Sequence, residues 1–254
     1  MCSFDRQGVP LSPLRPPLPS RRRLPPFHWL APLPGRRLAR LYAGLALYGA
    51  SDALVIRGDL GLDPWDVLHQ GLSRHTGISI GNVSIVVGAA VLLLWWPLRQ
   101  RPGLGTVSNV FLVGAFIDLT MAVVPPCQAL AARIPLLLAG VLLNGAATGL
   151  YISARFGPGP RDGLMTGLHL RTGRSLRLIR TGIELAALAA GYLLGGGVGV
   201  GTVLYAVAIG PLAQFFLRRF DRRFEQRPGR VVSASVPVVR EAPEPARPGK
   251  VDPI

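Results

Sequence analysis

Lysine is nearly absent from this 254-residue chain: it occurs once, at Lys250, and arginine supplies almost all of the formal net charge of +15. A Walker A phosphate loop requires a lysine in its glycine-rich turn, and a Schiff-base enzyme requires a lysine nucleophile. The body of the chain therefore holds neither kind of site. Charged residues of both signs together make up only 16% of the sequence.

Cysteine is equally scarce. Cys2 and Cys127 have no metal-binding spacing and no partners for a disulfide framework. The chain has no H-E-x-x-H zinc motif and no cysteine nucleophile with a histidine close by. We therefore expect no catalytic residue, no metal and no cofactor, and predict that the protein is not an enzyme.

What the chain has in abundance is long apolar runs. Hydrophobic residues make up 49% of it, and three runs belong to stretches of about twenty mostly apolar residues, long enough to cross a hydrocarbon layer of about 30 Å as helices. They are residues 85–98, 110–124 and 134–152. The predicted fold class is all-α, a polytopic helix bundle in the membrane, with the lipid bilayer as its surroundings.

The arginines cluster in the tails and between the apolar runs, as the positive-inside rule produces. We therefore attribute the positive charge to membrane topology and expect no nucleic-acid partner. The first forty residues lack a hydrophobic core of signal-peptide length, and their Pro/Arg-rich composition predicts disorder.

An internal repeat organises the chain. The stretch GLDPWDVLHQGLSRHTG, residues 61–77, returns as GPGPRDGLMTGLHLRTG, residues 157–173, displaced by 96 residues. An ungapped comparison of 41–118 with 137–214 finds 25 identities in 78 positions, including GLGTV and GVGTV further along. Such agreement in three separate blocks indicates a duplication.

Each copy contains three apolar spans and one polar segment too short to cross the membrane. We predict membrane repeats at 37–125 and 134–218, between disordered tails at 1–36 and 225–254. Three crossings per copy invert the second copy. With a cytoplasmic N-terminus, fifteen arginines near the spans lie inside and three outside, as an inverted-topology duplication requires. The expected location is the bacterial plasma membrane, with six spans and both termini cytoplasmic.

These same blocks carry a family resemblance. The sequence GLDPWDVLHQGLSRHTGISIG, followed by a span, PLRQRPGLGTVSN and GAFIDL, resembles the YczE-type branch of the YczE/YyaS/YitT bacterial integral membrane proteins. The resemblance covers roughly residues 40 to 217. It implies a multipass membrane protein and leaves its biochemical activity unassigned.

The two polar segments allow three interpretations. In one, Asp63 and Pro64 start a short helix and Asp66 accepts first-turn N–H groups, an arrangement that Pro160 and Asp162 repeat. In the second, two broken or re-entrant helices enter from opposite faces, with their N-termini near a central site. In the third, the segments are interfacial and lie outside the hydrocarbon.

Spacing defines the candidate binding residues. Asp66, His69, Gln70 and Ser73 would share one helix face, and Asp162, Thr166 and His169 the equivalent face of the second copy. The histidines could relay protons or be packing residues. Asp52, Asp118 and Glu184 fall within predicted spans, where a carboxylate should face the bundle interior or lie near a water-exposed end of the span.

The first functional hypothesis is a secondary transporter or permease for a small solute or coupling ion, working by alternating access. The competing class is a non-transporting scaffold or regulator, in which the duplication serves packing. An intramembrane enzyme is a third class. The sequence specifies neither the substrate nor the oligomeric state.

Overall fold

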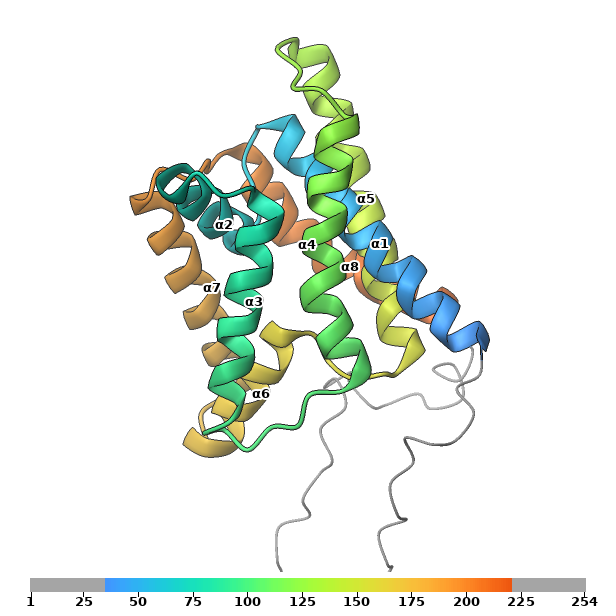
Figure 1. Ribbon diagram of the computed structural model, residues 1–254, viewed down its shortest axis with the longest axis vertical. Coiled ribbons are helices and arrows are strands. Elements are labelled where there is room, and N and C mark those ends of the chain that lie inside the picture. Colours follow the sequence, from blue (N-terminus) through green and yellow to red (C-terminus); the bar gives the residue numbers. More distant parts are fainter. Residues whose placement is uncertain (1–34, 221–254) are drawn as a thin grey trace, which may run out of the picture. The chain divides into compact units, whose positions relative to one another are not determined.

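The computed structural model describes residues 35–220, which form eight helices and no strand (Figure 1). The helices are α1 (Gly35–Gly58), α2 (Pro64–Thr76), α3 (Ile80–Trp95), α4 (Leu104–Val123), α5 (Leu130–Ala154), α6 (Pro160–Thr172), α7 (Leu176–Leu193) and α8 (Val200–Phe220). The all-α prediction is confirmed for this part of the chain. The predicted tails lie outside the described residues, except that residues 35 and 36 belong to the first turn of α1.

Helix starts recur at the 96-residue displacement of the repeat. The helices α2 and α6 begin at Pro64 and Pro160, and α4 and α8 begin at Leu104 and Val200. Proline suits the first helical turn because its missing N–H has no intrahelical partner there. Both short helices end at a left-handed glycine, Gly77 and Gly173, with φ of 71° and 67°. The local signals of the duplicated sequence therefore produce the same elements twice.

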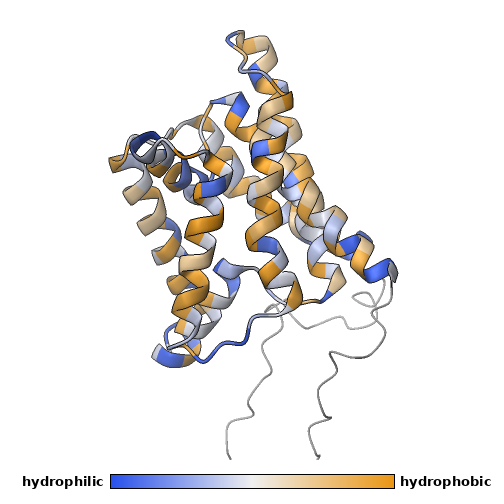
Figure 2. Ribbon diagram, viewed as in Figure 1, coloured by the Kyte–Doolittle hydropathy of each residue, from blue (hydrophilic) through white to orange (hydrophobic). Residues whose placement is uncertain are grey.

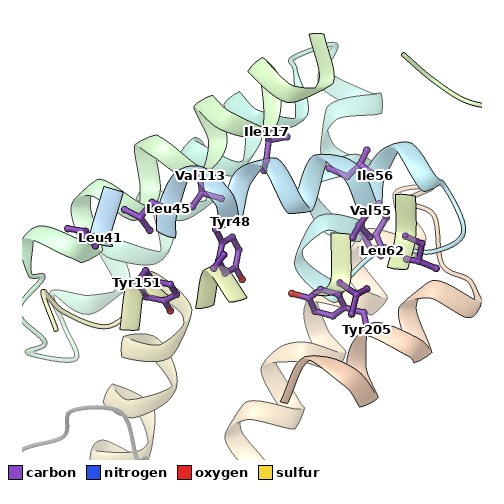
Figure 3. Packing of buried hydrophobic residues seen from close by; sticks show 14 of the residues in the cluster. Leu41, Leu45, Tyr48, Val55, Ile56, Leu62, Val113, Ile117, Tyr151 and Tyr205 are labelled. Atoms are coloured by element: carbon purple, nitrogen blue, oxygen red, sulfur yellow. The ribbon is translucent and has the colours of Figure 1, made fainter. Parts of the chain in front are cut away.

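The helices pack in two groups. A long-helix group, α1, α4, α5 and α8, encloses the larger cluster of buried apolar side chains, part of which Figure 3 shows. A short-helix group, α2, α3, α6 and α7, packs around Trp65, Val91, Leu164 and Ala187. Each group takes two helices from each copy of the repeat, so neither copy forms a core alone.

Small residues let the two copies approach each other closely. A Cβ atom on Gly44 of α1 would lie 2.8 Å from the backbone nitrogen of Tyr151, and one on Gly140 of α5 would lie 2.6 Å from Cγ2 of Val55. These two glycines occupy equivalent positions of the repeat. The α1–α5 contact is thus built from the same feature twice.

The backbones of the two copies are also joined reciprocally. The Gly105 N–H donates to the Phe156 carbonyl at 2.9 Å, and the equivalent Gly201 N–H donates to the Leu60 carbonyl at 2.8 Å. Each bond ties the start of a long helix to the loop before a short helix in the other copy. Each loop is therefore hydrogen-bonded to a helix of the other copy.

Three helices, α4, α5 and α8, are long and apolar enough to cross a membrane, and α2 with α3 forms a fourth candidate as one span bent by 113°. Figure 2 shows hydrophobic residues along most of α3 and α4. The helices α1 and α7, which contain several charged residues, are not among these candidates. Length and composition in residues 35–220 thus support three or four of the six expected crossings.

Candidate functional site

The two short helices meet at their N-termini through Arg161, the second residue of α6. Its Nη1 lies 3.4 Å from the Asp63 carboxylate at the start of α2, and its Nη2 donates to the Tyr48 hydroxyl on α1. The guanidinium also lies over the Trp65 ring, 5.9 Å from its centroid. Residues from both copies and both helix groups therefore converge at one point.

We call the polar side chains gathered here the polar centre. Its members are Tyr48, Asp52, Asp63, Asp66, Asn144, Tyr151, Arg161, Asp162 and Tyr205. Figure 3 shows its three tyrosines among buried aliphatic side chains.

On α2, the aspartates have distinct roles. The Asp63 side chain caps the helix by accepting from the Asp66 N–H at 2.6 Å. The Asp66 carboxylate instead faces Nδ1 of His69 at 3.2 Å, one turn along the predicted stripe. Our expectation that Asp66 accepts first-turn N–H groups is therefore corrected: Asp63 does so, because it stands at the N-cap.

A buried amide joins three long helices. Asn144 of α5 donates to Asp52 at 2.6 Å and to Ser51 at 3.0 Å, both on α1, and accepts from the Tyr205 hydroxyl of α8 at 3.0 Å. Asn144 is completely buried, and Asp52 is 4% exposed. The prediction that Asp52 faces the bundle interior is confirmed.

The start of α6 differs from that of α2 at the capping position. Gly159 occupies the position equivalent to Asp63, and because glycine has no side chain, no side chain caps α6. Asp162, the equivalent of Asp66, lies 3.4 Å from the Tyr151 hydroxyl, which donates to it. The duplication thus preserves the second carboxylate but exchanges the Asp63–Trp65 pair for Gly159 and Arg161.

Acidic groups outnumber basic groups in the polar centre. It contains four aspartates and the Arg161 guanidinium, with His69 next to Asp66. Ionised carboxylates out of water are costly unless they are paired or hydrogen-bonded. The arrangement is suited to holding protons or a small polar solute. Within residues 35–220 no group of three His, Cys, Asp or Glu side chains is placed to hold a metal ion.

The remaining predicted residues lie at the edges of the bundle. Ser73 donates to the Ile78 carbonyl at 2.6 Å, and its equivalent His169 contacts the Arg174 carbonyl through Nδ1, also at 2.6 Å. Both side chains bond the loop after their helix. Thr166 is half-buried on α6. The structure therefore does not bring His69 and His169 together.

Asp118 sits between two helices. Its carboxylate accepts from the Ser79 hydroxyl at 2.6 Å and from the Gly81 N–H at 2.8 Å, which ties the start of α3 to α4. Residues 77–81 read G-x-S-x-G, the pattern of a hydrolase nucleophile elbow, but that motif places its serine between a strand and a helix. Here Ser79 lies between two helices and caps α3.

A hollow of about 470 Å³ lies elsewhere, between α1 and α4. Its lining is almost entirely apolar, from Ala46, Leu47, Ala50, Phe116, Leu119, Thr120, Val123 and Val124. None of the polar-centre residues lines it. Its chemistry suits a lipid chain rather than a polar ligand.

Sequence reasoning missed five residues of the polar centre, namely Tyr48, Asn144, Tyr151, Arg161 and Tyr205, and it named Asp63 only at the start of a helix. From the sequence alone, Arg161 is one of the fifteen arginines expected on the cytoplasmic side. The sequence does mark Arg161: when residues 61–77 are aligned with 157–173, this arginine stands at the position of Trp65, so a charge replaces an aromatic ring. In the structure this position lies where the second copy contacts Asp63 and Tyr48 of the first.

Comparison with known proteins places the chain in a family. The family of unknown function DUF6198 matches residues 35–218, nearly the whole described region. An uncharacterised protein of Haemophilus influenzae is 41% identical over 187 residues, covering 74% of this chain and 86% of that protein. No solved structure matches.

Two Bacillus subtilis proteins carry the names that the motifs suggested. The uncharacterised membrane protein YczE is 36% identical over 178 residues, covering 69% of this chain and 83% of YczE. The uncharacterised protein YyaS is 27% identical over 185 residues, covering 71% of this chain and 92% of YyaS. With the family match across its helical body, the chain belongs to the DUF6198 family of YczE- and YyaS-like proteins.

Proposed function

We propose that this chain is a multipass protein of the bacterial plasma membrane, with six crossings, two inverted three-span repeats and both termini cytoplasmic. The apolar helices and the relative named as a membrane protein support a membrane location. The 96-residue recurrence of the helices and the distribution of arginines support the inversion. In this scheme α2 and α6 are the re-entrant short helices.

We further propose that the protein is a secondary transporter or permease for a small polar solute, and that it performs no enzymatic reaction. One observation carries this proposal: the N-termini of α2 and α6 meet through Arg161 and Asp63 inside a buried polar centre. Transporters with inverted repeats bind solutes at such half-helix ends, near the middle of the membrane.

The composition of the polar centre supports a role for protons. Asp52 and Asp66 are each 4% exposed, and the basic groups near them do not match the number of acids. A proton or a cationic group on the solute would balance this charge. The solute class we propose is therefore small, polar and able to bring positive charge or accept hydrogen bonds from Arg161.

A specific observation favours the scaffold alternative. Asn144 has protein partners on both its amide nitrogen and its oxygen, so this part of the polar centre is satisfied without a ligand. A scaffold would use such a network only to specify how the helices pack.

The deciding experiment compares flux in reconstituted vesicles. Asp66→Asn and Asp162→Asn should abolish solute or proton flux while the protein remains folded. Asp59→Asn is the matched control, because Asp59 is 65% exposed and pairs with Arg133 away from the centre. A broad solute screen with no flux above that of empty vesicles would overturn the transporter proposal and leave the scaffold.

A further inference from the structure

The two copies of the repeat differ in one packing contact. The helices α3 and α4 pack against each other, whereas the equivalent α7 and α8 make no comparable contact. Every other major helix pair has a packed counterpart in the second copy. The difference therefore needs a local cause.

Close α3–α4 packing depends on small residues. A Cβ atom on Gly81 would lie 2.1 Å from the Gly114 carbonyl oxygen, and one on Gly88 would lie 3.2 Å from Cγ1 of Val110. Asp118 adds two hydrogen bonds across the same seam. The backbones can approach because these α3 positions carry no side chain.

The equivalent face of α7 is polar. The counterparts of Gly81, Ile85 and Gly88 are Arg177, Thr181 and Glu184, at i, i+4 and i+7 of one helix face. Arg177 and Thr181 are exposed, and Glu184 is half-buried. This face of α7 therefore lacks the small residues that let α3 and α4 approach each other.

The facing side of α8 is correspondingly uncovered. Val110 and Gly114 of α4 are buried, whereas their counterparts Ala206 and Gly210 on α8 are exposed and half-buried. A Cβ on Gly210 would meet nothing within 4 Å. Gln214, which stands in place of Asp118, is exposed. No equivalent of the Asp118 link is present within the described residues of this seam.

A charged stripe of this kind does not face lipid, because ionised side chains in hydrocarbon cost several kcal/mol. The stripe also leads to the polar centre: Ile183 and Ala187, which flank Glu184, pack in the cluster that contains Trp65. Glu184 itself lies beside Trp65 and within electrostatic range of Arg161. Trp65 is 8% exposed, and its buried Nε1 has no hydrogen-bond partner among residues 35–220.

We propose that the space between α7 and α8 is a water-filled access path for polar solutes, leading from the arginine-rich end of these helices to the polar centre. The α3–α4 seam is its closed counterpart on the opposite side. The path begins at the helix ends that carry Arg177 and Arg218 and reaches the polar centre beside Glu184. Beyond that point lies the loop between α7 and α8, whose Gly197 and Gly199 contact α2 and the loop before it. This inference rests on the membrane placement in the proposed function.

Cysteine accessibility tests the path in the full-length protein with Cys2 and Cys127 replaced by serine. Thr181→Cys and Ala206→Cys should react with a charged, membrane-impermeant thiol reagent in inverted membrane vesicles and stay protected in intact cells. Their matched controls, Ile85→Cys and Val110→Cys, occupy the same positions of the closed seam. Ala186→Cys, exposed on the other face of α7, reports lipid contact.

We expect Thr181→Cys and Ala206→Cys to react at least about tenfold faster than all three controls, because only a hydrated thiolate is reactive. Equal rates at Thr181→Cys and Ala186→Cys would overturn the path, as would rapid reaction of Ile85→Cys and Val110→Cys. Two reporters on different helices guard against one variant misfolding. Cysteine labelling does not depend on transport. Rapid labelling of Thr181→Cys and Ala206→Cys together with no solute flux in vesicles would therefore refute the transporter proposal but support the access path.

Discussion

Replacing Asn144 by leucine tests whether the buried amide holds the long helices together. The substitution removes three hydrogen bonds, to Ser51, Asp52 and Tyr205. Interhelical hydrogen bonds in membrane proteins contribute on average about 0.6 kcal/mol each, so their loss accounts for about 2 kcal/mol. The Asp52 carboxylate, 4% exposed, also loses its amide partner, which adds about 1–3 kcal/mol.

We therefore expect Asn144→Leu to lower the free energy of unfolding by about 3–5 kcal/mol. The measurement is unfolding by SDS in mixed micelles, followed by circular dichroism. Tyr205→Phe removes only one of the bonds and should cost about 0.6–1 kcal/mol.

The double variant Asp52→Leu/Asn144→Leu separates the two contributions. Because the double variant removes the carboxylate together with its amide partner, it should recover at least the part due to the unpaired Asp52, while the Tyr205 hydroxyl still lacks its acceptor. If the double variant is as unstable as Asn144→Leu alone, the unpaired Asp52 is not the cause of the loss, and the reasoning is refuted.

Three further predictions concern glycines and topology. Gly163→Ala places a Cβ 1.9 Å from the Trp95 ring and should destabilise the fold by about 1–3 kcal/mol, with partial recovery on adding Trp95→Leu; SDS unfolding measures both. Gly61→Ala forces a side chain onto a backbone with φ of 116° and should cost about 1–3 kcal/mol, whereas Gly210→Ala should be neutral or stabilising by up to about 1 kcal/mol in the same assay. An impermeant thiol reagent should label Cys127 in intact cells and leave Cys2 protected; labelling of Cys2 alone would reverse the proposed orientation.

Local sequence signals predicted the helices well. Proline at the first turn and glycine just past the last turn mark both short helices, because each residue satisfies a backbone requirement of its own position. The predicted stripe of Asp66 and His69 also formed, since residues three apart share a helix face.

The sequence by itself therefore determined the all-helical class, the duplication and the starts of the short helices, because these depend on hydropathy, periodicity and residues near each other in the chain. Only the tertiary structure decided that Arg161 reaches Asp63 and Tyr48, and that Asn144 joins Asp52 to Tyr205. Those contacts join residues 61 to 113 positions apart, so helix packing selects them. Packing also decided that the α3–α4 seam is closed, while Arg177, Thr181 and Glu184 occupy the equivalent face in the second copy.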